Sequence, residues 1–136
     1  MGLSTDAIVA FGFDLGEDFE FDGYNPEDYD DGMSEYFDRL IGIKEWQSEG
    51  WVSFEVDEEI RKAAPVELVL HCSYDYPMYF LAVRGTVTES NRGYPVEFVP
   101  QTIDQEQLDE FKSWCDKHNI ELPEDAPKWY VFSRMG

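Results

Sequence analysis

The chain has 136 residues, of which 43% are hydrophobic and 16% aromatic, and its formal net charge is −20. This length suits one domain with its own core, and the apolar content excludes a disordered acidic tail. The negative charge disfavours nucleic acids and anionic membranes as partners, because both repel it. We therefore expect one domain, residues 1–136, with a basic protein as its partner.

The sequence predicts neither a membrane helix nor a secretory signal. No run approaches the roughly 18 to 20 apolar residues that a membrane helix needs, and no basic segment with a following apolar run opens the chain. Cys72 and Cys115 are too few for a disulfide framework and lie in apolar-periodic segments. We expect reduced thiols and a reducing compartment.

The N-terminal third predicts a strand followed by a helix. Asp6–Leu15 is an apolar run with an internal glycine, which favours a buried strand with another backbone packed closely against it. Asn25 and Pro26, followed by two acids, are typical of a helix start. Apolar residues at helical spacing continue this pattern, so the helix should end near Gly42; they are Tyr29, Met33, Tyr36, Phe37 and Leu40.

The pattern of residues 44–65 is mixed and leaves the structure of this segment open. Lys44–Trp51 suits a short helix or a turn. Val52, Phe54 and Val56 alternate with polar residues, as in a short strand. Residues 57–59 then open a short helix that Pro65 ends.

The C-terminal half predicts further strands and one more helix. Val66–Cys72 and Met78–Thr88 are β-rich runs joined by five residues, which implies antiparallel neighbours. Tyr94–Val99 suits a short edge strand, and Lys128–Met135 suits a last strand. Between them Asp104 should cap a helix, whose core stripe is Leu108, Phe111 and Cys115, with Trp114 beside it.

This order of elements defines the expected fold class. We expect an α+β fold with a mixed or antiparallel sheet of about four strands and two main helices packed on one face.

An acidic, aromatic-rich loop and helix start at about residues 14–38 is the leading candidate site. It holds eleven carboxylates and six aromatic residues, and the first basic residue of the chain is Arg39. Such carboxylates can stand where DNA phosphates stand. B-DNA carries one charge per about 1.7 Å, so twenty charges match roughly 34 Å, close to the width of a chain of this length. The predicted partner-binding carboxylates are Asp14, Glu17, Asp18, Glu20, Asp22, Glu27, Asp28, Asp30, Asp31, Glu35 and Asp38. The alternative is a solvated acidic face with no specific partner.

Two tyrosines in a turn, Tyr74 and Tyr76, are candidate interface anchors, since aromatic side chains often anchor protein contacts. Further aromatic or apolar residues either extend this patch or belong to the core; they are Met78, Phe80, Trp129, Tyr130 and Phe132.

Metal binding and catalysis are weaker interpretations. Asp18, Glu20, Asp22 and Gly23 resemble the first half of an EF-hand loop, but Tyr29 stands where a bidentate Glu is needed. A zinc site would combine Cys115 and His118 with one of His71 and Cys72, which are strand neighbours that point to opposite faces. An enzyme built on Cys72 or His118 is supported by residue types alone. We expect no metal, no cofactor and no catalytic residue.

Four parts of the sequence together carry a resemblance to known proteins: Ser4–Ile8, the acidic loop after the first strand, His71–Met78, and Lys128–Val131 with the terminal Gly136. In their order and spacing they resemble a group of small tailed-bacteriophage proteins. It implies a phage protein that works in the bacterial host cytoplasm. In charge and size only, the chain is similar to acidic phage inhibitors that mimic DNA.

The leading hypothesis is therefore a protein that inhibits a basic, nucleic-acid-binding host protein by DNA mimicry. The target would belong to an antiviral defence complex, such as CRISPR or restriction machinery. The alternative is a structural or accessory phage protein that acts through protein contacts, and a small metal-dependent or Cys-based enzyme comes third. The sequence leaves the oligomeric state open.

Overall fold

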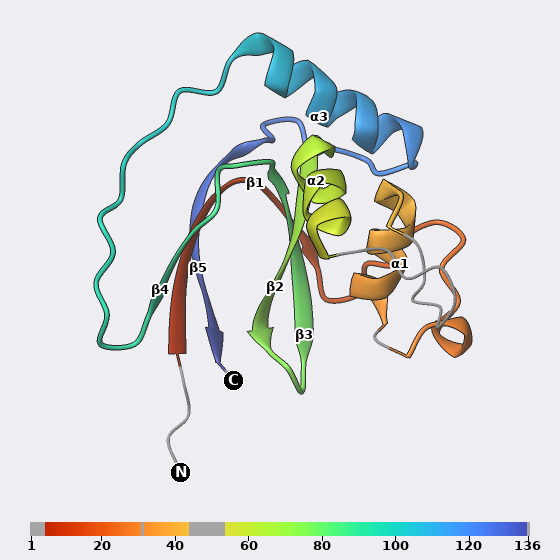
Figure 1. The fold of residues 1–136 in the computed structure, drawn as a ribbon, viewed down its shortest axis with the longest axis horizontal. Coiled ribbons are helices and arrows are strands. Elements are labelled where there is room, and N and C mark those ends of the chain that lie inside the picture. Colours follow the sequence, from red (N-terminus) through yellow and green to blue (C-terminus); the bar gives the residue numbers. More distant parts are fainter. Residues whose placement is uncertain (1–4, 31, 44–53, 136) are drawn as a thin grey trace.

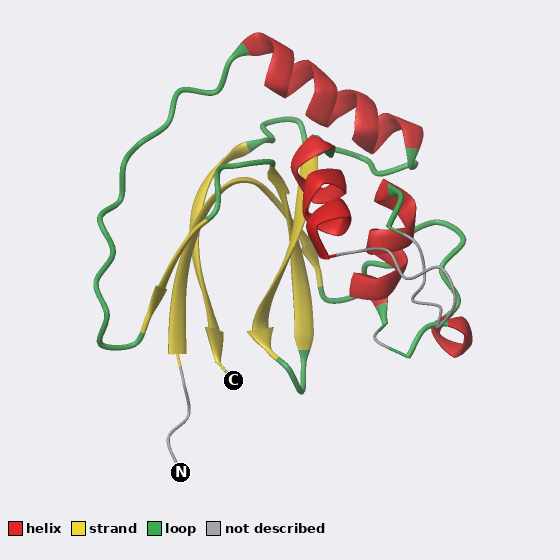
Figure 2. Cartoon of the chain, viewed as in Figure 1, coloured by secondary structure: helices red, strands yellow, loops and turns green. Residues whose placement is uncertain are grey.

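A computed structural model describes residues 5–30, 32–43 and 54–135, and it confirms the α+β class (Figures 1 and 2). The described part contains one mixed sheet of five strands and three α-helices. Its elements are β1 (Thr5–Gly16), a 3-10 turn (Pro26–Asp28), α1 (Met33–Ile41), α2 (Phe54–Ala63), β2 (Val66–Ser73), β3 (Pro77–Val83), β4 (Thr88–Asn91), α3 (Gln105–Lys117) and β5 (Lys128–Met135).

The sheet curls back on itself. Its strand order is β3-β2-β5-β1-β4, and β1 also pairs with β3, so that β1, β3, β2 and β5 form a ring. All pairs are antiparallel except β2 with β5, which meet in parallel where Cys72 and Ser73 lie opposite Arg134 and Met135. In Figure 1, β1 arches over the other strands from one side of the sheet to the other.

The arch depends on a close approach at Gly12. A Cβ atom there would collide with the carbonyl oxygen of Leu81 and lie 2.8 Å from the Cα of Ala82. Gly12 is therefore the point where β1 leaves β5 and joins β3. The sequence-based expectation of a buried strand whose glycine admits another backbone is confirmed.

A turn divides the expected strand 78–88 into β3 and β4, which accounts for the fifth strand. Gly85 has a φ of 85°, a conformation that favours glycine. The hydroxyl of Thr86, which is 1% exposed, donates to the Val83 carbonyl at 2.7 Å and accepts from the Phe11 amide at 3.2 Å. These bonds fix the turn against β1.

Apolar side chains fill both sides of the curled sheet. On the outer side, Phe13 and Leu81 pack against Phe37 of α1 and Phe111 of α3. On the inner side, Phe80 is 1% exposed and stacks on Phe132 with ring centroids 4.5 Å apart. The inner cluster also holds Ile8, Ala10, Val69 and Ala82.

The long helix expected after Asn25 is divided in the structure. Asn25 does cap a start, with Oδ1 accepting from the Glu27 amide at 3.2 Å, but only a 3-10 turn follows. The α-helix begins at Met33, after Gly32 with a φ of 68°. It ends at Gly42, as expected, because a left-handed C-cap there satisfies the last carbonyls.

Local sequence signals predicted the start of α3 correctly but left the start of α2 open. Residues 54–56 begin α2, so the strand considered there is wrong, and Lys44–Ser53 lie outside the described residues. Asp104 caps α3 through a complete capping box with Gln107, as its sequence predicts.

Two further expectations were an edge strand at residues 94–99 and a chain without a membrane helix. Tyr94–Val99 lies outside every described strand, so the expected edge strand is wrong. Within the described ranges, no helix combines the length and the apolar character that spanning a membrane requires.

Candidate acidic binding face

The acidic loop that follows β1 is attached to the core by one buried ring. Phe21 is 3% exposed, and its ring lies 6.1 Å from that of Phe37 in α1 and 6.4 Å from that of Trp114 in α3. Phe19 packs edge-on against Phe21 at 5.0 Å. The alternation of acids with Phe19 and Phe21 thus turns the apolar rings inward and leaves the carboxylates outside.

Three tyrosines hold the second half of the loop. The rings of Tyr24, Tyr29 and Tyr36 form a triangle with centroid distances of 5.9, 5.5 and 5.2 Å. Because Tyr36 belongs to α1, this cluster ties the 3-10 turn to a helix.

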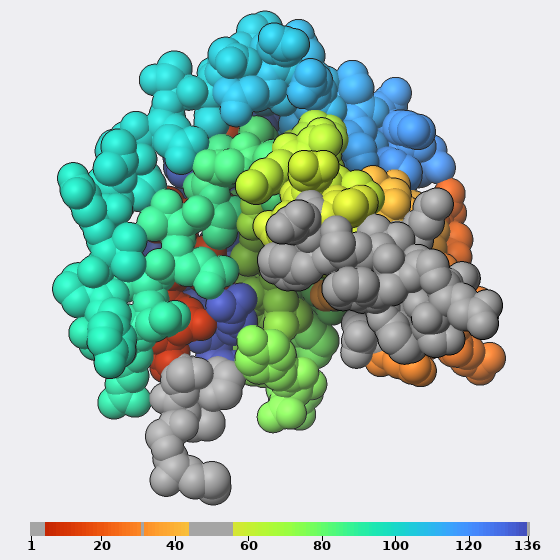
Figure 3. Space-filling model, in the orientation of Figure 1, coloured from red at the N-terminus to blue at the C-terminus, as the bar shows by residue number. Residues whose placement is uncertain are grey.

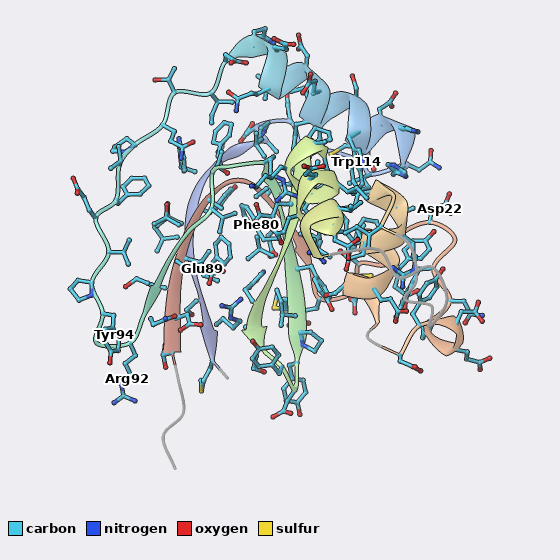
Figure 4. The ribbon with its side chains drawn as sticks, viewed as in Figure 1. Asp22, Phe80, Glu89, Arg92, Tyr94 and Trp114 are labelled. Atoms are coloured by element: carbon cyan, nitrogen blue, oxygen red, sulfur yellow. The ribbon has the colours of Figure 1, made fainter. Side chains whose placement is uncertain are left out.

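Asp22 is the most firmly held acid of the loop. Its backbone carbonyl accepts from the Tyr36 hydroxyl at 2.8 Å, and its Oδ2 accepts from the Asn119 side-chain amide at 2.9 Å. Figure 4 shows Asp22 beside α1 and the end of α3. The loop is therefore fixed from two helices.

Seven carboxylates of the loop are exposed, and we call this set the acidic face. Among the described residues, none of the seven forms an ion pair with a basic side chain. No basic side chain of the described ranges therefore neutralises the face. Its members are Glu17, Asp18, Glu20, Asp22, Glu27, Asp28 and Asp30.

Three of the predicted carboxylates are engaged elsewhere. Asp14 lies on β1, before the loop begins, and its Oδ1 is 2.9 Å from Nε2 of His71. Glu35 pairs with Arg39 at 3.3 Å, and Asp38 pairs with Arg61 at 3.6 Å. Asp31, the remaining member of the predicted set, lies outside the described residues.

Burial affects the pKa of Asp38. Desolvation raises it above its ordinary value, and the neighbouring Arg61 guanidinium only partly offsets this. Asp38 is thus a helix-packing residue more than part of an exposed template.

Two arginines of the sheet region pair with acids that lie outside the acidic face. The Arg134 guanidinium of β5 donates hydrogen bonds to Asp6 at 3.0 Å, to Glu89 at 3.1 Å and to the Leu70 carbonyl at 3.3 Å. Arg84 bonds Glu67 at 3.0 Å, where β3 ends. Neither arginine pairs with a member of the acidic face.

Tyr74 and Tyr76 are 66% and 78% exposed in the turn between β2 and β3. The register of β1 with β3 places Gly16 opposite Tyr79. The acidic loop therefore begins beside β3, the strand that follows this turn. The carboxylates and the two tyrosines of the predicted set thus lie toward the same end of the sheet. Of the other aromatic candidates, Trp129 and Tyr130 are also exposed, at 37% and 42%. Phe80 is buried and Phe132 packs on it, so these two belong to the core.

Asn119 was not among the sequence candidates. The signal available was its place after α3, since asparagine tolerates the left-handed conformation it adopts, with a φ of 58°. Its contact with the loop joins residues 97 positions apart, so no local pattern indicates it.

The structure separates the ligands that a zinc site would need. Cys115 is 0% exposed on the outer side of the sheet, and burial raises its thiol pKa to about 12. His71 bonds Asp14 and packs on Phe132 on the inner side. His118 contacts the Trp114 ring at 4.3 Å, and burial lowers its pKa. Over the described ranges, no three His, Cys, Asp or Glu side chains are grouped to hold a metal ion.

Comparisons with known proteins add no relative to this description. The chain matches no protein-family model, no curated protein and no solved structure.

Proposed function

We propose that the protein is a non-enzymatic inhibitor that binds a basic, nucleic-acid-binding surface of another protein through the acidic face. The observation that carries the proposal is the set of seven exposed carboxylates, unpaired within the described residues, on one anchored loop. An anchored loop backbone needs little reordering on binding, which lowers the entropic cost of the complex. Opposite charge also speeds the encounter.

Its net charge and the resemblance to phage proteins favour a target in a host antiviral defence complex, such as CRISPR or restriction machinery. The protein would then act in the bacterial cytoplasm and occupy the groove that otherwise holds DNA or RNA. The exposed Tyr74 and Tyr76 would add apolar contacts at the edge of the interface.

The target class can be found by capture. Purified protein is used as bait with a lysate of a defence-competent bacterium, at low and at high salt. A basic nuclease or CRISPR-type complex that binds at low salt and is released at high salt supports the proposal, because screening weakens contacts between exposed charges. Capture that is equally strong at both salt concentrations contradicts it.

The role of the face itself is tested with two matched triple variants. One changes Glu17, Glu20 and Glu27 to Gln, and the control changes Glu106, Glu110 and Glu124 to Gln. All six side chains are exposed, and each variant removes three negative charges. We expect the first variant to lose about tenfold or more in affinity for the captured protein, and the control far less. Equal losses would mean that only net charge matters.

A further inference from the structure

An apolar segment lies exposed on the side of the molecule away from the acidic face. Residues 94–100, here called the arm, follow β4 and run outside the sheet (Figure 1), and the stretch of the chain that contains them lies along one edge of the space-filling view (Figure 3). The exposed fractions of Tyr94, Val96, Phe98 and Val99 are 73%, 51%, 44% and 62%. Such exposure of neighbouring apolar side chains marks an interaction site in a folded protein.

The arm has the sequence of a strand without the bonds of one. Tyr94, Val96 and Phe98 alternate with other residues, as in a half-buried strand. Within the described chain, no backbone group of residues 95–100 bonds another backbone group. A local strand preference that the fold leaves unused points to a functional segment.

Both ends of the arm are held in place. The Tyr94 amide donates to the Asn91 carbonyl at 2.9 Å, and the Ser90 hydroxyl donates to the Tyr94 carbonyl at 2.9 Å. At the other end, Gln101 Nε2 donates to the Gly85 carbonyl at 3.0 Å. An open groove of about 550 Å³ separates the start of the arm from the sheet, lined in part by Thr5, Ala7, Ser133, Tyr94 and Pro95.

The arm and its flanking residues differ in net charge from the rest of the chain. Residues 91–103 contain one base, Arg92, and one acid, Glu97, so this stretch has no net charge in a chain of −20. Figure 4 shows Tyr94 and Asp22 at opposite sides of the molecule. Two copies of the chain can therefore approach through their arms while their acidic faces stay far apart.

We propose that the arm pairs with the arm of a second copy of this chain and forms an antiparallel two-stranded ribbon across a two-fold axis. Identical segments pair this way because the two-fold axis presents the same surface to each partner. In such a ribbon, alternate residues between Pro95 and Pro100 exchange backbone hydrogen bonds with the other copy, and the apolar side chains of both arms are covered. This inference does not depend on the proposed function. The dimer would carry two acidic faces pointing outward.

Sedimentation equilibrium over a wide range of protein concentration tests the proposal. We expect a monomer–dimer equilibrium that strengthens with added salt, since screening reduces the repulsion between two chains of like charge. Binding through the acidic face responds to salt in the opposite direction, so the two proposals can fail separately. A monomer at every concentration and salt level would overturn the dimer.

Matched variants locate the contact. The change Tyr94→Ser with Val96→Ser should weaken dimerisation at least tenfold, and the control Val131→Ser, at a side chain 77% exposed on β5, should leave it unchanged. Hydrogen exchange gives a second readout: alternate amides among residues 96–99 should become protected as the concentration rises. A dimer that keeps its affinity in the arm variant, or amides that exchange equally fast at all concentrations, would refute arm pairing.

Discussion

The side-chain amide of Asn119 donates a hydrogen bond of 2.9 Å to Oδ2 of Asp22, and this bond joins the acidic loop to the end of α3. It fixes a carboxylate of the acidic face from a helix that packs on the sheet through Phe111. The loop therefore takes part of its conformation from the core.

A double-mutant cycle measures this tether. Asn119→Gly removes the amide and tolerates the φ of 58°, and Asp22→Ala removes the acceptor. We expect a coupling free energy of about 0.5 to 1.5 kcal/mol in urea unfolding. Asn119→Gly should also reduce affinity for the basic partner without changing net charge. Additive effects of the two changes on stability would show that the bond contributes nothing.

The close approach at Gly12 predicts a large effect from a small substitution. Gly12→Ala places a methyl group against the Leu81 carbonyl, so β1 and β3 must move apart. We expect a loss of roughly 3 kcal/mol in the free energy of unfolding. Ala7→Val, which enlarges an exposed side chain of the same strand, is the control and should change stability by less than about 0.5 kcal/mol. The two variants should differ clearly in their urea midpoints.

The raised pKa of Asp38 predicts how stability depends on pH. Burial raises the folded pKa above the ordinary value of 3.8, so the folded state holds its proton more tightly than the unfolded state. The stabilising contribution of the protonated form is fully present below 3.8 and is lost as the pH rises through the folded pKa. Asp38→Asn should therefore gain stability relative to wild type as the pH rises from 3.5 to 7. Urea unfolding at several pH values checks this, and a difference that is constant with pH would contradict it.

The two thiols should differ in reactivity. Cys72 is exposed, whereas Cys115 is buried and its pKa is raised to about 12. Only the thiolate reacts with a disulfide reagent, so one thiol per native chain should titrate rapidly at pH 8. Both should react in denaturant. The variant Cys72→Ser should abolish the native reaction, and a rapid reaction that persists in it would show that the buried thiol is accessible.

Local sequence signals correctly predicted the elements whose causes are local. Asp104 has the capping residue Gln107 three positions on, and Gly42 has the conformational freedom that a helix end needs. The apolar runs that became β1, β2 and β5 were likewise recognisable, because burial on a sheet requires such residues.

Errors arose where tertiary contacts outweighed local preference. The helix expected from Asn25 breaks at Gly32, because the Tyr24, Tyr29 and Tyr36 cluster folds the 3-10 turn back on α1. Tyr94–Val99 has a strand-like pattern, but no neighbouring strand of the described sheet offers it a ladder. An alternating sequence pattern indicates that a segment can form a strand, but a strand forms only where a neighbouring strand is available for backbone hydrogen bonds.

The sequence by itself determined the charge, the α+β class and the presence of an acidic, aromatic-rich loop, since each follows from composition or short-range periodicity. Only the tertiary structure decided which acids face solvent without a basic partner. Asp14, Glu35 and Asp38 are engaged by His71, Arg39 and Arg61, while the seven carboxylates of the acidic face remain outside. The reason is that ion pairing and burial depend on distances between residues far apart in the chain, which no local pattern encodes.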